Sequence, residues 1–206
     1  MKISLTDAGK RFNRDWIFRH LNFTFENSRS YAIIGPNGSG KSTLLQLIAG
    51  SLDITEGKIH WAINNESIED SNVFRSVSIS APYLEVIEEM TAIEFLNFHK
   101  QFKPFLQNIN TATIIEEIGL SSSKNKQIRY YSSGMKQRIK LAQAIFSDTP
   151  VVLLDEPCTN LDENGYQLYY SLVDKFCKKR LLIVSSNEEK EIVFCQEKLD
   201  IQSFKR

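Results

Sequence analysis

A glycine-rich loop between an apolar segment and a predicted helix constrains this chain more than any other sequence feature. Residues 35–42 read Gly-Pro-Asn-Gly-Ser-Gly-Lys-Ser and match the phosphate-loop pattern G-x-x-x-x-G-K-[ST] at every defined position. The apolar run 31–34 predicts a buried strand before the loop, and residues 42–49 predict a helix after it. Glycines let backbone N–H groups turn toward an anion, and a helix N-terminus favours negative charge. The loop therefore predicts a phosphate-binding site on an α/β fold.

Two side chains of this loop have separate expected roles. Lys41 can reach the terminal phosphates of a nucleotide. The Ser42 hydroxyl can hold Mg²⁺, because this hard cation prefers oxygen ligands. The loop residues that we predict to bind nucleotide are Gly35, Pro36, Asn37, Gly38, Ser39, Gly40, Lys41, Ser42 and Thr43.

A second apolar segment, residues 151–154, ends in the acidic pair Asp155 and Glu156. A buried strand that delivers a carboxylate beside a phosphate loop is the second half of a P-loop ATPase site. We expect Asp155 to bind Mg²⁺, directly or through water. We expect Glu156 to be the catalytic residue, which orients or deprotonates the attacking water. ATP and Mg²⁺ are the predicted ligands of the combined site.

The remaining patterns predict a doubly wound α/β core with helices inserted into it. Residues 2–5 and 21–25 alternate in polarity and predict two short strands, while residues 181–184 predict another buried strand. From about residue 88 the periodicity becomes helical, so a mostly helical block lies inside the α/β chain. A length of 206 residues is that of one domain.

Composition narrows the choice of partners and location. Lys plus Arg and Asp plus Glu number 25 each, and this zero net charge argues against a nucleic-acid partner. No apolar run approaches the roughly 18–20 residues of a membrane span, and the N-terminus does not read as a secretory signal. The three cysteines form no C-x-x-C pair and fit reduced thiols. We therefore expect a cytoplasmic protein. The histidines, His20, His60 and His99, read as surface or strand residues.

Residues 131–138, Tyr-Ser-Ser-Gly-Met-Lys-Gln-Arg, resemble the signature motif of ATP-binding-cassette (ABC) ATPases. Residues 35–43 look like the Walker A motif of that family, residues 151–157 like its Walker B motif and residues 159–162 like its D-loop. The resemblance covers essentially the whole chain, and this set of motifs is highly specific. Kinases and GTPases of the P-loop class have the phosphate loop without such a signature before an acidic strand.

The resemblance implies a fold and a division into parts. The fold is α/β, with a P-loop NTPase (RecA-like) core, a small antiparallel β subdomain and an inserted α-helical subdomain. Residues 1–206 form a single ABC ATPase domain, with the core at about 1–81 and 131–206 and the helical subdomain at about 82–130.

The resemblance also implies a head-to-tail dimer, of two copies or with a related ATPase subunit, that holds two nucleotides between the subunits. Ser132, Gly134 and Asp162 then face the nucleotide held by the partner. A signature at a helix start agrees physically, since helix N-termini bind anions. The membrane part is implied to be separate permease subunits, with this protein peripheral on the inner face of the cell membrane.

For two sets of residues the sequence allows two interpretations. Phe12 lies where the family places an aromatic ring under adenine, and Trp16 is its rival. Met90, Ile93 and Leu96 share one side of the first inserted helix. They can form a docking surface for the membrane subunits, but core packing is the favoured interpretation.

The chain lacks the glutamine that the family usually places after the strand near Ile79. By count, Pro82 or Ala81 occupies that place, and neither side chain can coordinate a metal. A water molecule or Glu85 could substitute, although we favour neither. The signature also departs from its most familiar form, because a serine and a methionine stand where a glycine and a glutamine are usual.

The histidine that ends the family's last core strand is also replaced. Ser186 falls at its position by count, and Asn187 lies one residue away. Either side chain can bond to a phosphate oxygen but stabilises developing charge less than an imidazolium. These departures predict ATP binding with slow hydrolysis, for which Glu156 is the remaining catalytic group.

The leading interpretation is the ATP-hydrolysing subunit of an ABC transporter. The alternative is an ATP-gated dimerisation or regulatory module with little or no hydrolysis, which the missing glutamine and histidine suggest. An ABC ATPase that acts on nucleic acid or ribosomes usually has two cassettes or a long insert, and this chain has neither. A metabolite kinase is disfavoured by the signature.

Overall fold

The computed structural model describes residues 1–205. The strands are β1 (Lys2–Phe12), β2 (Asp15–Glu26), β3 (Ser30–Ile34), β4 (Glu56–Ile63), β5 (Glu66–Ile68), β6 (Val77–Ser80), β7 (Val151–Asp155), β8 (Leu181–Ser185) and β9 (Glu197–Asp200). The α-helices are α1 (Lys41–Ile48), α2 (Ala92–Phe102), α3 (Thr111–Glu117), α4 (Ser133–Ile145), α5 (Glu163–Phe176) and α6 (Glu189–Ile192). Short 3₁₀ helices are η1 (Asp70–Arg75), η2 (Ser121–Ser123), η3 (Ile128–Tyr130) and η4 (Ile201–Phe204).

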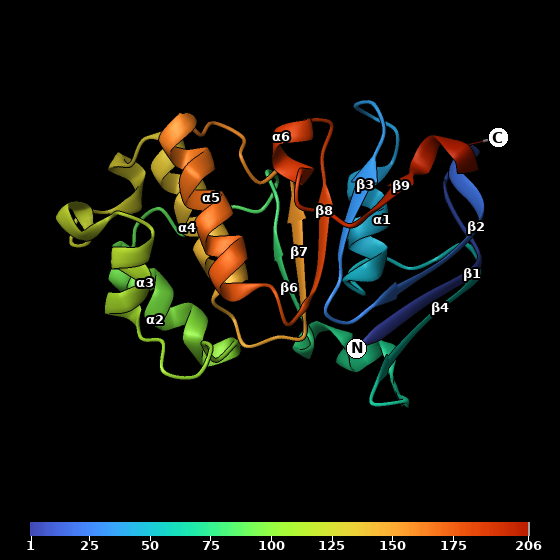
Figure 1. Cartoon of the computed structure of the whole chain (residues 1–206), viewed down its shortest axis with the longest axis horizontal. Coiled ribbons are helices and arrows are strands. Elements are labelled where there is room, and N and C mark those ends of the chain that lie inside the picture. The colour runs from blue at the N-terminus through green and yellow to red at the C-terminus, as the bar shows by residue number, and fades with distance from the viewer. Residues whose placement is uncertain (206) are drawn as a thin grey trace.

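A parallel sheet of five strands, in the order β6-β7-β8-β3-β9, forms the centre of the molecule (Figure 1). Every residue of β7 and β8 is buried, as expected for strands covered on both faces. Because all the strands run the same way, the segments that follow β3, β6, β7 and β8 emerge at one edge of the sheet. The predicted α/β fold is therefore confirmed, and this edge carries the predicted nucleotide loop.

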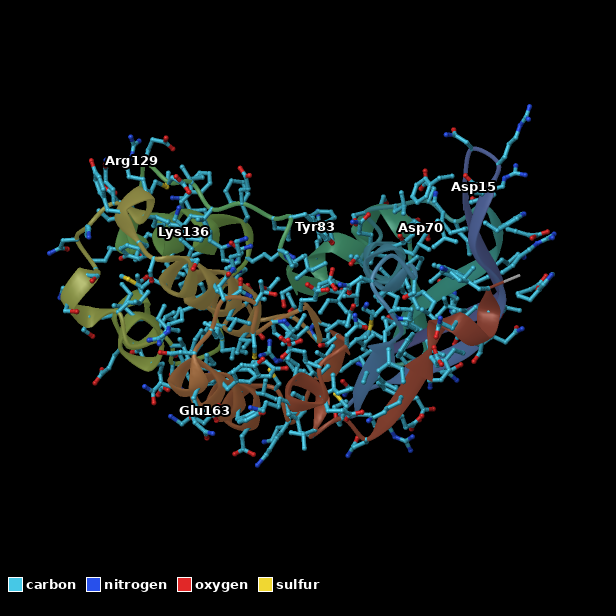
Figure 2. All side chains as sticks on the ribbon, turned by 90° about the horizontal axis from the view of Figure 1, so that it is seen from above. Asp15, Asp70, Tyr83, Arg129, Lys136 and Glu163 are labelled. Carbon is cyan, nitrogen blue, oxygen red and sulfur yellow. The ribbon has the colours of Figure 1, made fainter. Side chains whose placement is uncertain are left out.

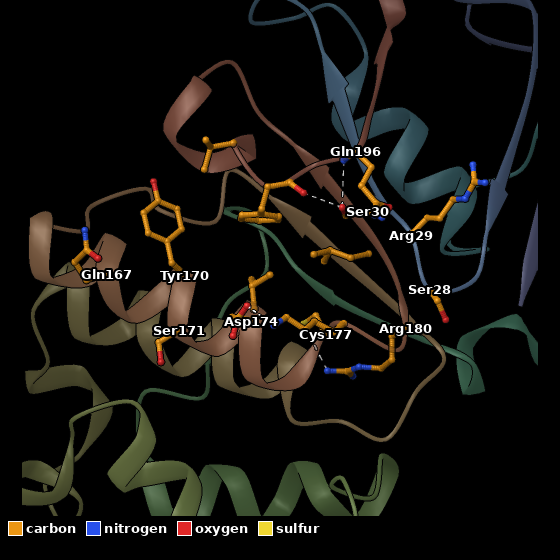
Figure 3. A pocket seen from close by; sticks show the side chains of 15 residues that line it. Ser28, Arg29, Ser30, Gln167, Tyr170, Ser171, Asp174, Cys177, Arg180 and Gln196 are labelled. Carbon is orange, nitrogen blue, oxygen red and sulfur yellow. Dashed lines mark hydrogen bonds and ion pairs between the residues drawn. The ribbon is translucent and has the colours of Figure 1, made fainter.

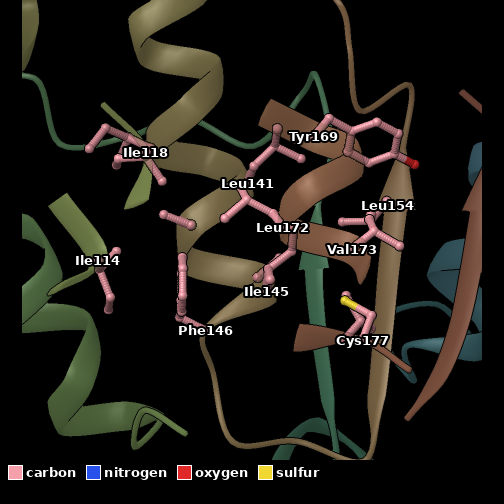
Figure 4. Close-up of a cluster of buried hydrophobic side chains, with 14 of the residues drawn as sticks. Ile114, Ile118, Leu141, Ile145, Phe146, Leu154, Tyr169, Leu172, Val173 and Cys177 are labelled. Carbon is pink, nitrogen blue, oxygen red and sulfur yellow. The ribbon is translucent and has the colours of Figure 1, made fainter. Parts of the chain in front are cut away.

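Alternate residues of the central strands belong to two separate hydrophobic cores. Leu154 and Val184 face the core beneath α4 and α5, whereas Leu153 and Ile183 face the core beneath α1 and the N-terminal strands. Figure 4 shows Leu154 beside Leu172 and Val173 of α5. Each face of the sheet is thus covered by its own layer, which fixes the loops at its edge.

The N-terminal strands form an antiparallel sheet in the order β2-β1-β4-β5, at the opposite end of the molecule from α2 and α3 (Figure 1). The two short strands that we predicted are in fact one long hairpin with its turn near Asn13. The β1–β2 pairing shifts register after Leu5 and again after Ala8, and Asp7 has φ 49°. These irregularities interrupt the alternation of buried and exposed side chains. The strands predicted from that alternation are therefore shorter than the strands of the structure.

The inserted helices present one stripe to the core and another to solvent. A capping box between Thr91 and Glu94 starts α2. Leu96 is fully buried, and Met90 and Ile93 pack against the same core. Met90, Ile93 and Leu96 therefore pack in the core, as the favoured interpretation of the sequence expected. Phe98 and Phe102, in contrast, are 40% and 70% exposed.

His99 departs from its expected place, because it lies on α2 and is partly buried. Its Nε2 atom lies 2.8 Å from Oγ of Ser147. Burial, assisted by the charge of Lys103, lowers the pKa of His99 from 6.5 to about 4. The folded ring therefore stays neutral at a pH at which the unfolded chain already binds a proton.

We expect the fold to lose stability through His99 as the pH falls from about 6.5 toward 4, and to keep this contribution above pH 6.5. Thermal unfolding across that range measures the effect. In His99→Gln, the free energy of unfolding should fall less steeply with decreasing pH than in the wild type. The upper limit of this difference in slope is about 1.4 kcal/mol per pH unit, and partial solvent exposure of the ring makes the real difference smaller. His60→Gln, at an exposed position of β4, is the matched control. An unaltered slope in His99→Gln would refute this assignment.

Candidate nucleotide site

The phosphate loop follows β3 directly and holds its lysine inward. Lys41 is 5% exposed and donates from Nζ to the backbone oxygens of Gly35 at 2.8 Å and Pro36 at 3.3 Å. Gly40 has φ 107°, and a Cβ atom there would lie 2.3 Å from Cγ2 of Ile17. Only glycine fits this backbone. A side chain at residue 40 would therefore fill the space that the loop backbone encloses.

Polar atoms at the same edge are buried without partners among residues 1–205. They include Oδ1 of Asp155 and the hydroxyls of Ser39, Ser80 and Ser185. Asp155 is 1% exposed and lies opposite Ser185 in the β7–β8 pairing. An unpaired buried carboxylate oxygen costs free energy unless a cation or donor satisfies it. These residues therefore fit a Mg²⁺-bound nucleotide, which Ser42 and Asp155 would hold.

Glu156 is brought to the phosphate loop by a strained backbone. Its φ is 44°, in the left-handed region, and its N–H donates to the backbone oxygen of Ser185 at 2.8 Å. A hollow of about 230 Å³ joins Glu156 to the loop. Its lining residues are Ile17, Asn37, Gly38, Gly40, Lys41, Ser42, Thr43 and Glu156. The structure thus places the predicted catalytic carboxylate beside the predicted phosphate-binding residues.

The signature motif starts α4 at a second hollow, of about 350 Å³. Ser132 caps the helix by accepting from the Met135 N–H at 3.3 Å, and Gly134, Asn160 and Asp162 line the same hollow. A Cβ atom on Gly134 would lie 3.0 Å from the Asn160 backbone oxygen, so this helix start and the D-loop pack closely. In the described part of the chain, this hollow shares no lining residue with the phosphate-loop hollow.

Two contacts link the signature helix to the segment that follows the acidic strand. Gln137 donates to the backbone oxygen of Pro157 at 2.7 Å. Asp162 caps α5 by accepting from the Gly165 N–H at 2.8 Å and lies 3.9 Å from the Arg138 guanidinium. The signature, the acidic strand and the D-loop therefore form one connected unit.

The two aromatic candidates for adenine stacking have different surroundings. The Trp16 ring is covered by guanidinium groups, with Arg19 at 4.4 Å and Arg11 at 5.2 Å from its centroid. The Phe12 ring is 45% exposed, and Nζ of Lys10 lies 5.0 Å from its centroid. Ile17, which sequence reasoning missed, lines the hollow at the phosphate loop. Ile17 lies in the long strand β2, outside the short strands predicted from the sequence, and its apolar type gave no signal of this position.

Asn187, not Ser186, reaches the phosphate loop. Ser186 is 1% exposed, and its hydroxyl accepts from the Glu188 N–H at 2.9 Å. The Asn187 side chain accepts from Nζ of Lys41 at 3.0 Å and donates to Oδ1 of Asn37 at 2.5 Å. Asn187, which counting placed one residue away from the position of the family's histidine, is therefore the residue whose side chain contacts the loop.

Tyr83 lies beside the place where the family has its glutamine. Figure 2 shows it midway along one edge of the molecule, between Lys136 and Asp70. Burial raises the pKa of the Tyr83 hydroxyl, a hydrogen bond with Gln46 lowers it, and the charge of Asp155 raises it. Pro82 offers its backbone oxygen to Nζ of Lys140 at 3.0 Å. Neither Ala81, which is buried, nor Pro82 supplies a side-chain oxygen.

A larger hollow of about 670 Å³ lies away from this edge, between α5 and the segments at Ser30 and Phe194 (Figure 3). Its charged groups are engaged within the fold. Arg180 donates to the backbone oxygens of Ile145 and Ser147, and Arg29 pairs with Glu197 at 2.6 Å. The walls of this hollow are therefore largely apolar, and Arg180 and Arg29 already have hydrogen-bond or ion-pair partners within the fold.

None of the helices within residues 1–205 has the length and apolar character to cross a membrane. The family model of the ABC transporter ATPases matches residues 18–159. YybJ of Bacillus subtilis, an uncharacterized ABC transporter ATP-binding protein, is 28% identical over 92% of this chain and 86% of its own length. CcmA of Reclinomonas americana, a cytochrome c biogenesis ATP-binding export protein, is 31% identical over 82% of this chain and 77% of its own length.

Solved structures show the same fold over the whole chain. A protein from Pyrococcus furiosus described as an ABC transporter ATP-binding protein superimposes with a TM-score of 0.85, at 20% identity and 100% coverage of both chains. A bacterial Atm1-family ABC exporter with ATP bound gives a TM-score of 0.79 at 21% identity, over 97% of this chain and 37% of the exporter chain. With the family match over residues 18–159, these likenesses show that the chain belongs to the ABC transporter ATP-binding proteins.

Proposed function

We propose that this chain hydrolyses Mg-ATP in a head-to-tail dimer and thereby drives transport by separate membrane subunits. The observation that carries the proposal is that Lys41 and Glu156 line one hollow at the edge of the sheet where β7 ends in Asp155, while the signature helix bonds to the segment just after that strand. The dimer consists of two copies or includes a related ATPase subunit. No nucleic-acid partner is proposed, given the zero net charge.

The residues at this edge of the sheet have separate roles in the proposed reaction. The loop from Gly35 to Thr43 binds the phosphates of ATP, with Lys41 on the terminal ones. Ser42 and Asp155 would hold Mg²⁺, which when bound would supply positive charge to the terminal phosphates. Glu156 accepts a proton from the attacking water. Phe12 and Ile17 offer apolar surface for the adenine ring.

The separation of the two hollows within one chain supports this dimer. Ser132, Gly134 and Asp162 line the signature hollow, which shares no lining residue with the phosphate-loop hollow among residues 1–205. A two-fold arrangement brings the signature hollow of one subunit over the phosphate loop of the other. ATP then joins the two surfaces, and hydrolysis separates them.

Exposed aromatic side chains on α2, on η1 and in the segment after β6 supply a surface for the membrane subunits. Phe98, Phe102 and Phe74 are 40%, 70% and 57% exposed, and Tyr83 is 46% exposed. Nζ of Lys103 donates to the Phe74 backbone oxygen at 2.9 Å, which fixes the end of α2 against η1. We assign this aromatic face to a membrane partner at the inner face of the cell membrane.

The purified protein should release phosphate from ATP slowly and only with Mg²⁺. Turnover is slow because Ala81 or Pro82 stands where glutamine is usual, and Ser186 or Asn187 where histidine is usual, and none of these side chains supplies positive charge. Phosphate release with Mg²⁺, and with EDTA as control, measures it. The regulatory alternative predicts ATP-driven dimerisation without phosphate release, and that result would overturn the hydrolytic proposal.

A further inference from the structure

One peptide group just after the acidic strand is hydrogen-bonded to a side chain at each of its ends. Its carbonyl oxygen, that of Pro157, accepts from Nε2 of Gln137 at 2.7 Å. Its N–H, that of Cys158, donates to Oε1 of Glu191 at 2.7 Å. Gln137 belongs to the signature helix α4, and Glu191 belongs to α6, which follows β8. Because the C=O and N–H of a trans peptide point in opposite directions, the two side chains approach it from opposite sides.

This arrangement is closed to water. Gln137, Cys158 and Glu191 are 4%, 3% and 2% exposed. Hydrogen bonds in such surroundings are stronger than in water, and bonds at the two ends of one peptide polarise each other. Oε2 of Glu191 is buried without a partner among residues 1–205. A buried carboxyl group with an unpaired oxygen is unfavourable, which indicates that Glu191 has a role beyond packing.

The bound peptide follows Glu156 after a single residue. Glu156 has a φ of 44°, a strained conformation that persists only where the surrounding structure enforces it. Its backbone oxygen accepts from Oγ1 of Thr159 at 3.0 Å, so the turn closes on itself. Proline fixes its own φ, and few free dihedral angles therefore separate Glu156 from the peptide between Pro157 and Cys158. A shift of that peptide must change the position of the Glu156 side chain.

We propose that Gln137 and Glu191 are positioning residues for Glu156, and that they act together by holding one peptide from opposite sides. Neither side chain lines the nucleotide hollow within residues 1–205, so both act through the backbone. A movement of the signature helix thereby reaches the carboxylate of the same chain through the Gln137 bond. This inference rests on the proposed hydrolysis, in which Glu156 accepts the proton from water.

Steady-state ATP turnover of the full chain with Mg²⁺ tests the inference by separating kcat from KM. Gln137→Leu removes the donor and keeps a side chain of similar size, whereas Glu191→Ala removes the acceptor. Each should lower kcat about tenfold, through the loss of one buried hydrogen bond, and leave KM within about twofold. The double variant should lose little more than either single variant, because both bonds serve the same peptide. Glu191→Gln keeps an acceptor oxygen and should retain most of the wild-type kcat.

Matched controls are available on the same two helices. Gln143→Leu lies at a partly exposed position of α4, and Glu189→Ala at an exposed position of α6. Both should leave kcat unchanged. Thermal unfolding verifies that each variant is folded, and if Glu191→Ala does not fold, Gln137→Leu and Glu191→Gln decide the outcome.

Hydrogen exchange of the Cys158 amide, measured by NMR without nucleotide, tests the bound peptide independently of hydrolysis. Glu191→Ala should speed this exchange at least about tenfold. Gln137→Leu should speed it as well, although this change leaves the bond of the Cys158 N–H itself in place. Unchanged exchange in Gln137→Leu would overturn the inference. So would additive losses of kcat in the double variant, or a rise in KM as large as the fall in kcat.

A wild-type chain that releases no phosphate from Mg-ATP would instead refute the proposed function. The exchange measurement would then still decide whether Gln137 and Glu191 hold the peptide together. The two failures are thus distinguishable.

Discussion

Glu156→Gln should reduce ATP turnover by at least about 100-fold while ATP binding is retained. The carboxylate lines the hollow with Lys41 and Ser42, so it is placed to accept a proton from water. Glutamine keeps the shape of the side chain but cannot accept this proton at neutral pH. The variant should therefore hold ATP between two subunits, and size-exclusion chromatography with Mg-ATP should show a dimer that ADP does not support.

The matched control for this variant is Glu66→Gln on β5, at an exposed position of the antiparallel sheet. It makes the same chemical change far from the nucleotide edge and should keep the wild-type rate. If Glu156→Gln hydrolyses ATP at the wild-type rate, Glu156 is not the catalytic base. A loss of ATP binding in Glu156→Gln would mean that the side chain mainly positions the loop.

Replacing both Phe98 and Phe102 with serine should release the protein from membranes. The centroids of the two rings lie 5.1 Å apart on α2, and the residues are 40% and 70% exposed, whereas Leu96 of the same helix is fully buried. Their removal takes apolar area from the aromatic face without opening the core, so the fold should persist. The share of the protein that sediments with membranes measures the effect, and we expect at least a tenfold fall.

Val193→Ser serves as the control for this double variant, because Val193 is 71% exposed and lines the hollow at α5 rather than the aromatic face. It should leave membrane recovery unchanged. ATP turnover of the double variant without membranes should equal that of the wild type, since neither phenylalanine lines the nucleotide hollow. Wild-type membrane recovery of the double variant would exclude α2 as the docking element.

Sequence patterns predicted the phosphate loop and the buried strands because their signals are local. The run before Gly35 is apolar without alternation, and the glycines that follow are required by backbone conformation. The position of the acidic pair at the end of β7 was predictable for the same reason, since strand and carboxylates are contiguous. The long β1–β2 hairpin was missed, because bulges near Asp7 disrupt the two-residue period.

Contacts between distant segments could not be predicted in this way. Counting placed Ser186 where the family has its histidine, but the Ser186 hydroxyl is turned to the Glu188 N–H, and Asn187 reaches Lys41 across 146 positions of sequence. Periodicity favoured core packing for Leu96, as the structure has it, but did not predict that Phe102 of the same helix is 70% exposed. Which side of a helix meets the core depends on its tertiary neighbours.

The central claim, that this ATPase serves a separate membrane transporter, is tested most directly by capturing the chain from detergent-solubilised membranes of the cells that produce it. Our account predicts that a membrane protein with several spans is retained in stoichiometric amount with the wild-type chain and is lost with the Phe98→Ser, Phe102→Ser variant. Recovery of the wild-type chain only in the soluble fraction, with no membrane protein attached, would contradict it.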